Sequence, residues 1–494
     1  MNNVRKKVFV LLFIMVLILP ILTINRISGV MSKSENRYLA EFPQIFNADG
    51  ELAEGLKNST ENWLNDNIGF RELFVKLYSN FNYHFLGRSP NERVEIGSEG
   101  WLYYTRDNNL KIAAGTYPLS LQDLEKIKNH QEKVQEYFND QGIEYVLILP
   151  PSKVSIYPEF IRSGDYSVRN TPDDIVAEYL LQNSNIKVIK LKDDLLKAKS
   201  NEQVFFKTDT HWNESGAYIG YQTIIKELNR FGLTDSKPIS VNMVPSTYKG
   251  EFAAMMGDQN LLKAEYTQES EIPLAKAQKI TNGNVYDTIE KIKKKYNLKK
   301  PCYIYSNPSV QGKKVLMYGD SMFGVWNMPE LLAENFPEFT YMWTYNIQQE
   351  TIDTVKPDIV FYEIAERFID QIHTKNIRLI TSPMRNPKAE IVSHNTPTSI
   401  SRKGTYTIDI TIKNTGDESW SEEKMVRLCV FQDGESYRIY LPDGEEVRPG
   451  EEYTFVLSRF ESPRRGNTTY LEYQMIEEGV RWFGEKERID IMIE

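Results

Sequence analysis

Two short peptides of this chain contain the residue types that acyl transfer through a serine requires. Asp209 precedes His211 by two positions, and Ser321 follows a Gly-Asp pair at the end of an apolar run. Serine is a poor nucleophile until a base takes its proton, and a carboxylate orients the imidazole that does so. The peptides therefore predict Ser321 as nucleophile, His211 as base and Asp209 as orienting acid.

Each peptide also has a purely structural interpretation. The Gly-Asp-Ser sequence is a common turn, in which Gly319 permits a tight bend and Asp320 caps a helix expected to follow. Asp209 could cap the helix expected to begin near Asn213, with His211 merely packed beside it. The other histidines have no comparable setting and are interpreted as surface or core residues: His84, His130, His373 and His394.

Acyl transfer also needs donors for the developing oxyanion and groups that hold the substrate. Besides the N–H of the serine, Gly250 and Asn346 are candidate oxyanion donors, although glycine often marks a turn and asparagine a local cap. Arg367 could bind a sugar or form an ion pair, and we prefer the ion pair. Trp343 and Tyr345 are candidate sugar-stacking platforms, against the commoner role of aromatic rings in core packing.

The elements that must position these residues are apolar strands separated by helices. Continuous apolar runs predict strands at 145–149, 188–189, 315–318 and 359–362, and amphipathic patterns predict helices at 121–138 and 172–181. Such strands imply an α/β fold with a parallel sheet that helices cover on both faces. Ligands bind at the carboxyl ends of such strands, where Ser321 lies. The lysine-rich segment 276–300 is expected to be an exposed helix or an insertion.

Two further patterns precede this sheet, and a different one follows it. A helical pattern occupies residues 52–86, and residues 94–96 and 101–104 form a predicted hairpin. After residue 388 the apolar residues alternate, with turns between the runs, which predicts an all-β sandwich. The inward positions are Ile408, Ile410, Ile412, Val426, Leu428, Val430, Tyr453, Phe455, Leu457, Leu471, Tyr473 and Met475.

The N-terminus indicates a membrane location. Val8 to Ile24 is almost wholly apolar, at the lower limit of a spanning length, and Arg5, Lys6 and Lys7 precede it. The basic cluster places the N-terminus inside and the rest of the chain outside. We favour an uncleaved single-pass anchor, and a cleaved signal peptide, which would give a secreted protein, is the alternative.

Composition excludes several classes of function. The 494 residues carry a net charge of −9, with 41% apolar and 12% aromatic residues, as in a soluble protein of several domains. This acidic balance argues against nucleic acid as a partner and against broad adhesion to anionic lipid. The two cysteines are assigned to different domains, so we expect no structural disulfide, and the five histidines do not cluster, so we expect no metal site and no cofactor.

The same peptides resemble a known family, the alginate O-acetyltransferase group, which is the AlgJ/AlgX-like branch of the SGNH hydrolase superfamily. The resemblance covers roughly residues 33–380 and rests on five segments in chain order: 35–43, 96–104, 150–159, 206–213 and 318–321. It implies an SGNH-like fold with Ser321, His211 and Asp209 in the roles given above. The C-terminal segment resembles a four-tryptophan, NBR-like immunoglobulin domain, through residues 413–417 with Trp420 and residues 481–484.

These inferences give an expected organisation and function. A membrane segment (1–32), an SGNH-like domain (33–385) and a β-sandwich with a binding or accessory role (388–494) would form a membrane-anchored, extracytoplasmic O-acetyltransferase. The resemblance implies a polysaccharide as acceptor and a membrane-bound O-acyltransferase as the partner that supplies acetyl groups. Two alternatives stay open: an acetylesterase with the same triad, and a non-catalytic polysaccharide-binding or assembly protein.

Overall fold

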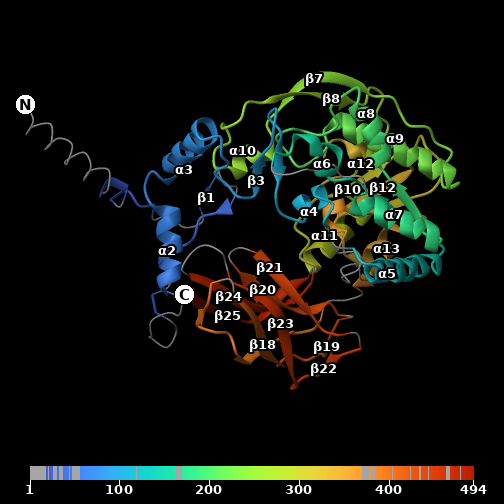
Figure 1. The fold of residues 1–494 in the computed structure, drawn as a ribbon. Helices are drawn as coiled ribbons and strands as arrows, with labels where there is room; N and C mark the ends of the chain where they lie inside the picture. The colour runs from blue at the N-terminus through green and yellow to red at the C-terminus, as the bar shows by residue number, and fades with distance from the viewer. Residues whose placement is uncertain are drawn as a thin grey trace, which may run out of the picture.

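The structure is a computed structural model of the chain, drawn in Figure 1. It describes residues 18–20, 22–25, 30–32, 37–43, 45–46, 56–117, 119–162, 170–369, 379–380, 384–402, 404–422, 424–432, 435–442, 444–462, 468–478 and 480–493. Most of the predicted membrane segment, including residues 1–17, lies outside these ranges. Among the helices that are described, none has both the length and the apolar character needed to cross a membrane.

A seven-stranded sheet forms the centre of the larger domain. The strand order is β6 (Lys187–Lys190), β5 (Glu144–Leu149), β14 (Ile359–Glu363), β11 (Val315–Gly319), β12 (Glu338–Trp343), β10 (Cys302–Ser306) and β9 (Gln278–Lys279). The first five strands pair in parallel. The predicted α/β fold is therefore confirmed at this level.

Helices cover both faces of this sheet, as Figure 1 shows. One face packs against α5 (Leu121–Asn139), α7 (Pro172–Asn183), α11 (Asn284–Lys295) and α13 (Gln349–Val355). The other packs against α4 (Asn109–Ala113), α6 (Lys153–Ile156), α8 (Lys192–Lys199), α9 (Glu214–Arg230) and α12 (Met328–Ala333). Successive residues of β11 alternate between the two cores, because strand side chains point to opposite faces. This explains why these strands are apolar throughout.

The sheet departs from the prediction at one edge. Strands β10 and β9 run antiparallel to their neighbours, so the sheet is mixed rather than parallel. The expectation for segment 276–300 also needs correction. It forms α11, but Ile289 and Ile292 are buried in the core, so the helix covers the sheet and is not an insertion outside it. Its lysines mark only the outward face of an amphipathic helix.

The remaining elements of the larger domain surround the sheet. N-terminal helices α2 (Leu56–Asn67) and α3 (Arg71–Asn80) continue into a π-helix, η1 (Phe81–Phe85), within the predicted helical segment. The predicted hairpin is β3 (Val94–Ile96) with β4 (Leu102–Tyr104). The paired strands β7 (Asn242–Tyr248) and β8 (Glu265–Glu271) flank α10 (Glu251–Met255). Short elements complete the domain: β1 (Met31–Ser32), β2 (Arg37–Tyr38), η2 (Pro158–Phe160), β13 (Ile347–Gln348), η3 (Glu366–Phe368) and β15 (Leu379–Ile380).

The C-terminal residues form a separate β-rich region. One sheet contains β16 (Ala389–His394), β18 (Thr405–Asn414) and β23 (Glu452–Glu461). The second contains β17 (Ser399–Ile400), β25 (Arg481–Ile493), β24 (Thr468–Glu477), β20 (Val426–Gln432) and β21 (Glu435–Tyr440), and β19 (Trp420–Ser421) pairs with β22 (Glu446–Val447). The predicted inward residues build one core together with Trp420, with Tyr453 and Leu457 only partly buried. The immunoglobulin-type assignment stays a prediction.

Candidate active site

Asp209 and His211 form a hydrogen-bonded pair in a tight turn before α9. The Nδ1 atom of His211 lies 2.6 Å from Oδ1 of Asp209. Asp209 is only 2% exposed, whereas His211 is partly exposed. Asn213, not Asp209, caps α9, because its side chain accepts the Gly216 N–H at 3.0 Å. The capping interpretation of Asp209 is therefore wrong, and its carboxylate serves the imidazole.

Both carboxylate oxygens of Asp209 are fully engaged. Oδ1 also accepts the His211 N–H (3.1 Å), and Oδ2 accepts the Tyr248 hydroxyl (2.7 Å) and the Glu251 N–H (3.1 Å). Burial alone would raise the pKa of Asp209, but the hydrogen bond and charge of His211 and the bond from Tyr248 outweigh it and hold the pKa below its usual range. Asp209 therefore stays ionised and holds the ring.

The buried side chain of Lys153 stabilises the turn that carries Asp209 and His211. The ammonium of Lys153 donates to the carbonyl oxygens of Phe206 (3.2 Å), Lys207 (3.2 Å) and Asp209 (2.6 Å). Burial lowers the pKa of Lys153 to about 7, against the opposing charges of Asp209, Glu265 and Glu251. Three backbone carbonyls that point at one ammonium cannot move independently, so Lys153 fixes the path of the turn.

Two acidic residues and a tyrosine of the β7–β8 region complete this support. Glu265 accepts the N–H groups of Lys207 (2.8 Å) and Thr208 (3.0 Å). Glu251 provides its N–H to Asp209, and its carboxylate accepts the Thr210 hydroxyl at 2.6 Å. The sequence analysis did not identify Tyr248, Glu251, Glu265 or Lys153 as members of the site. Two signals were present in the sequence: Lys153 lies in the family-like segment 150–159, and Tyr248 and Glu251 lie in the motif around Gly250.

Ser321 lies half-buried in the turn after β11. The Met322 N–H donates to Oδ1 of Asp320 at 2.7 Å, so this carboxylate caps the turn. The expected helix does not begin here, because α12 starts at Met328. Trp326 and its neighbour have positive φ angles of 60° and 57°, which a right-handed helix does not admit.

The glycine before this turn has a steric reason. A Cβ atom on Gly319 would lie 2.4 Å from Oε2 of Glu363, at the end of the adjacent β14. The same oxygen accepts the Asp320 N–H at 2.8 Å. Glu363 is fully buried, and burial, then the charge of Asp320, raises its pKa. The Glu363 side chain therefore occupies the space that any larger residue at position 319 would need.

The fold packs the two predicted peptides against each other. The rings of Trp212 and Phe323 have centroids 5.4 Å apart, and these residues immediately follow His211 and closely follow Ser321. Trp326, from the same turn as Ser321, contacts the rings of Phe206 (4.7 Å) and Tyr248 (4.9 Å). The Ser321 turn thus lies on the aromatic residues that flank the Asp209–His211 pair.

The atoms that would exchange the proton are both unengaged. The Nε2 atom of His211 is buried without a hydrogen-bond partner. Within the described residues, no hydrogen bond joins it to Ser321, whose hydroxyl and N–H also make none. A buried ring nitrogen without a partner is unusual and points to a group that binds or arrives during function.

The other candidates differ in position. Trp343 lies beside the serine turn, because it pairs in register with Gly319, and a Cβ on Gly324 would lie 2.7 Å from its ring. The Tyr345 hydroxyl donates a hydrogen bond to Oδ2 of Asp320. Tyr345 therefore stabilises the serine turn and does not present a free ring for stacking on a sugar. Asn346 is partly exposed three residues beyond Trp343, and its N–H donates to the Thr344 hydroxyl at 3.1 Å.

Gly250 and Arg367 depart from their expected roles. The Gly250 N–H donates to the Thr208 hydroxyl at 3.2 Å, so it is already engaged and is not a free oxyanion donor. Glycine is needed there because a Cβ would lie 1.9 Å from the Thr208 carbonyl oxygen. Arg367 forms no ion pair among the residues that the structure describes, and its guanidinium lies 4.9 Å from the Phe368 ring centroid. The preferred ion pair is therefore absent there, although the charge of Arg367 acts to lower the pKa of Glu363.

A second group of buried carboxyls lies at the ends of β5 and β14. Glu366 accepts the Ser152 N–H (2.8 Å) and the Ser155 hydroxyl (2.5 Å). Burial, then the charge of Glu366, raises the pKa of Asp173. Asp173 therefore keeps its proton at a pH where a free carboxyl group has lost it. This pair connects the start of α7 to η3 and was not anticipated from the sequence.

One group of side chains has the spacing of a metal site. Ligand atoms of Asp209, His211 and Glu251 lie within 4.8 Å of one another. The two Asp209 oxygens, however, already accept four hydrogen bonds, which is the capacity of a carboxylate. The hydrogen-bonded arrangement is therefore that of an oriented base and not of a vacant metal site.

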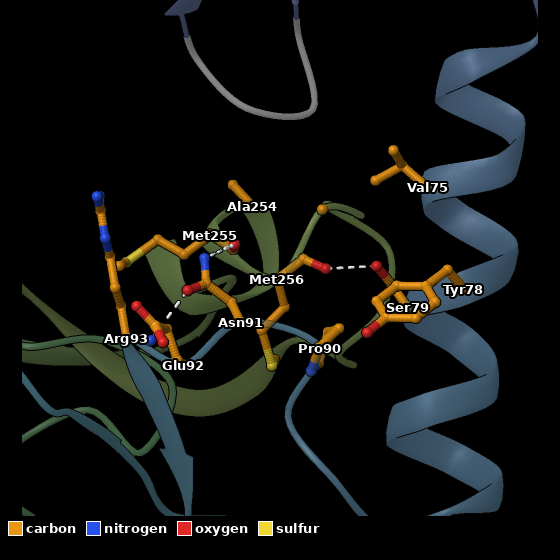
Figure 2. Close-up of a pocket in the computed structure, with 11 residues that line it drawn as sticks. Val75, Tyr78, Ser79, Pro90, Asn91, Glu92, Arg93, Ala254, Met255 and Met256 are labelled. Carbon is orange, nitrogen blue, oxygen red and sulfur yellow. Dashed lines mark hydrogen bonds between the residues drawn. The ribbon is translucent and has the colours of Figure 1, made fainter. Parts of the chain in front are cut away.

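A cavity of about 530 Å³ lies apart from these residues, between α3 and α10 (Figure 2). None of the predicted catalytic or substrate-binding residues lines it. Its wall includes Val75, Tyr78, Ser79, Asn91, Met255 and Met256. The Asn91 amide donates to the Met255 carbonyl at 2.6 Å, so this region is tied to the end of α10.

The chain is similar to several known proteins. Residues 94–288 match the family model described as "SGNH hydrolase-like domain, acetyltransferase AlgX". The match includes Asp209 and His211 but ends before Ser321. Two similar proteins are probable alginate O-acetylases AlgJ. The one from Pseudomonas putida is 28% identical over 147 residues, 29% of this chain and 36% of that protein. The one from Pseudomonas aeruginosa is 30% identical over 191 residues, 38% of this chain and 46% of that protein.

The chain thus spans less than half the length of each of these relatives. Solved structures include Bacillus cereus PatB1 with a sulfonyl adduct, at 17% identity, covering 58% of this chain and all of that one with a TM-score of 0.42. The O-acetyltransferase domain of Pseudomonas putida AlgJ is 18% identical and covers 56% of this chain and 92% of that one, with a TM-score of 0.40. The α/β fold assignment rests on the family match and the strand order.

Proposed function

We propose that this chain, which belongs through residues 94–288 to the AlgX-type SGNH hydrolase-like acetyltransferase family, is an extracytoplasmic O-acetyltransferase. It would transfer acetyl groups to hydroxyl groups of a surface or secreted polysaccharide. The similar AlgJ proteins are named as alginate O-acetylases, which supports acetyl as the group transferred. The apolar segment 8–24 after a basic cluster supports attachment to the membrane.

One observation carries the catalytic part of this proposal. The imidazole of His211 is oriented by an ionised, fully hydrogen-bonded Asp209, while its Nε2 is buried without a partner. The packing of the Trp212 ring against the Phe323 ring supports a position of the Ser321 turn close to this imidazole. An oriented base with an unengaged nitrogen beside a turn that carries a serine is the arrangement that a serine nucleophile needs.

The reaction would proceed in two halves. Nε2 of His211 accepts the proton of the Ser321 hydroxyl as Oγ bonds to the acetyl carbonyl carbon of the donor ester. The donor oxygen then leaves with that proton, and Ser321 is acetylated. A sugar hydroxyl next gives its proton to Nε2 as its oxygen attacks the acetyl carbon, the bond to Oγ breaks, and Oγ recovers the proton. The unengaged Ser321 N–H would stabilise the oxyanion in both halves.

Two partners follow from the proposal. The acceptor would be a polysaccharide, with the partly exposed Trp343, beside the serine turn, as its stacking surface. Arg367 and Asn346 stay candidates for contacts with sugar hydroxyls. The donor would be a membrane-bound O-acyltransferase that presents an acetyl group outside the cytoplasm, since cytosolic acetyl donors cannot reach an extracytoplasmic site.

Substitution of the nucleophile tests the proposal directly. Ser321→Ala, incubated with an acetyl ester and an oligosaccharide, is expected to give no acetylated sugar by mass spectrometry while its circular dichroism stays that of the wild type. Ser309→Ala, in a loop outside the site, is the matched control and is expected to retain transfer.

The products distinguish the alternatives. Acetylated sugar from the wild type and none from Ser321→Ala supports the transferase. Free acetate alone, with water present but sugar unmodified, supports an esterase with the same triad. Equal transfer by wild type and Ser321→Ala removes Ser321 from the mechanism, and no turnover of any acetyl ester by the wild type favours a non-catalytic binding protein.

A further inference from the structure

The helix formed by α3 and η1 presents an apolar face to solvent. Six side chains recur at three- and four-residue spacing, which places them on one side of a helix. We name this set the apolar stripe: Phe70, Leu73, Phe74, Leu77, Phe81 and Phe85. Each is between 44% and 80% exposed. An exposed contiguous apolar surface of this kind indicates a contact with another molecule or a membrane.

The opposite side of the same helix is polar and packs inward. Ser79 is buried and donates to the Met256 carbonyl at 2.5 Å, and Asn80 donates to Asp258 at 3.1 Å. Figure 2 shows Ser79 of α3 facing Met256 across this contact. A helix on the surface of a soluble protein has the reverse arrangement, with apolar residues toward the core. The sequence therefore reserves the apolar side for something outside the domain.

The predicted membrane segment ends where the apolar stripe begins. The Gly69 N–H donates to the Pro20 carbonyl at 2.9 Å, and the Asn25 N–H donates to the Asn67 carbonyl at 2.8 Å. The backbone at Gly69 lies so close to Thr23 that a Cβ atom on Gly69 would be 1.9 Å from the Thr23 hydroxyl oxygen. A membrane-inserted segment 8–24 would thus bring the junction of α2 and α3 to the lipid surface.

The charges that flank the apolar stripe also suit a lipid surface. Lys76 and Arg88 lie on or just beyond this helix with a single acidic residue, Glu72, while Arg71 pairs with Asp66 at 3.7 Å. The chain as a whole carries −9, so the helix differs in sign from the rest of the protein. Basic residues beside a broad apolar face are the pattern of a helix that lies in the interface of a membrane.

We propose that α3 and η1 lie along the membrane surface with the apolar stripe among the lipids, as a second membrane contact beyond the N-terminal segment. The inference rests on the membrane attachment in the proposed function. This contact would also keep the candidate active site at a constant distance from the membrane surface. The helix is bonded to Met256 at the end of α10, and Glu251 at the start of α10 holds Asp209. The Asp209–His211 pair would thus be fixed relative to the bilayer from which the acetyl group arrives.

Nitroxide labelling of the full-length chain in vesicles tests the contact. Leu77→Cys places a label in the apolar stripe, Glu72→Cys places one on the polar side of the same helix, and Leu121→Cys places one at an exposed leucine (77%) of α5. The native thiols react slowly at neutral pH, since burial raises the pKa of Cys302 to about 12 and of Cys429 to about 11. Vesicles of phosphatidylcholine with phosphatidylglycerol are used, with unlabelled wild type as the background control.

We expect collisions with a water-soluble nickel chelate to be several-fold fewer for the label at position 77 than at positions 72 and 121, and collisions with oxygen to be more frequent. Flotation with the vesicles is measured first. Equal nickel access at all three positions in floating protein overturns this inference and leaves the anchor and the catalytic proposal intact. Failure to float overturns the anchor and the inference together, while acetyl transfer is tested separately. Spin–spin coupling between position-77 labels, lost on dilution with unlabelled chain, shows a second copy on the apolar stripe and also overturns the lipid contact.

Discussion

Asp209 contributes to the site only through the groups that surround it. Its four hydrogen bonds come from His211, Tyr248 and the Glu251 backbone, and each would weaken the carboxylate's hold on the imidazole if removed. Tyr248 is the one donor among them that can be deleted without a change in backbone or base. Its ring, packed against Phe206 and Trp326, would remain in a phenylalanine variant.

Tyr248→Phe is therefore expected to slow acetyl transfer without unfolding the chain. The lost hydrogen bond to a charged acceptor contributes about 1.5 kcal/mol, and if all of it acts in the transition state the rate falls about tenfold. The measurement is the steady-state rate of sugar acetylation. Tyr266→Phe, at an exposed tyrosine of β8, is the matched control and should keep the wild-type rate. A wild-type rate in Tyr248→Phe would show that this hydroxyl does not support the base.

Lys153 gives the protein a pH-dependent stability. Its pKa is about 7 in the folded chain against 10.5 when free, so between these values the unfolded chain binds the extra proton. The free energy of unfolding therefore rises with pH across this window, by at most about 1.4 kcal/mol per pH unit. Lys153→Met removes the titrating group. The free energy of unfolding of the wild type, relative to that of the variant, should therefore increase between about pH 7 and about pH 9.

Urea unfolding at the two pH values measures this difference. Lys199→Met, at a partly exposed lysine, is the control. Its free energy of unfolding should differ from that of the wild type by the same amount at both pH values. The contradicting outcome is a difference in free energy of unfolding between wild type and Lys153→Met that is the same at both pH values. That result would mean that Lys153 keeps its proton throughout this range because the three carbonyl groups hold the ammonium form.

The elements around the sheet are joined by buried polar contacts as well as by apolar cores. Asp173, in the first turn of α7, is a buried carboxyl group whose pKa is raised by burial and by the charge of Glu366 of η3. Its neighbour Asp174 has the opposite behaviour. Burial raises the pKa of Asp174, but the hydrogen bonds and charges of Lys192 and Lys190 outweigh it, so the pKa is lowered. Adjacent residues at one helix start thus respond to pH in opposite senses.

Asp173→Asn should stabilise the chain more as pH rises. In the folded wild type, Asp173 keeps its proton above the unfolded pKa of 3.8, so the free energy of unfolding falls as pH increases. Asparagine removes that loss. It also keeps the side-chain oxygen that accepts the Asp174 N–H at 2.9 Å. Thermal unfolding at about pH 5 and about pH 8 measures the change. Asp174→Asn, the neighbouring control, should destabilise at both. Stabilisation by Asp173→Asn that does not grow with pH would contradict the raised pKa of Asp173.

The α/β domain and the C-terminal β-rich region form one structure where they meet. Val480, in the turn between β24 and β25, is 4% exposed within a core of the α/β domain, and the Met384 N–H donates to Glu477 at 2.6 Å. The described hydrogen bonds of Asp209 all come from the α/β domain. The β-rich region therefore contributes to stability at this junction, and among the described residues it donates no hydrogen bond to Asp209.

Truncation after residue 385 is expected to lower the thermal midpoint while leaving acetyl transfer per folded molecule unchanged. Polymer retention should fall if the β-rich region has the accessory binding role predicted for it. Val480→Ala in the full chain, which removes about 2 kcal/mol of apolar burial at most, shows how much of the loss comes from this one contact. Loss of transfer in folded, truncated protein would give the β-rich region a direct part in the reaction.

Local sequence patterns determined the framework of this protein. The apolar runs that became β5, β11 and β14 and the alternating residues of the C-terminal sheets were readable because strand and helix periods are local properties. The Asp209–His211 pair was readable for the same reason, since both residues lie in one turn.

Contacts between distant segments were decided only by the tertiary structure. Lys153 reaches carbonyl groups more than fifty positions away, and Tyr248 reaches Asp209 across a separate strand, so no spacing rule indicates either. The helical period in α3 was visible, but the period does not indicate which way the apolar side faces. Ser79 and Asn80 bond to the α10 region and turn the apolar stripe outward. A period fixes which residues share a face, whereas only packing partners fix which way that face points.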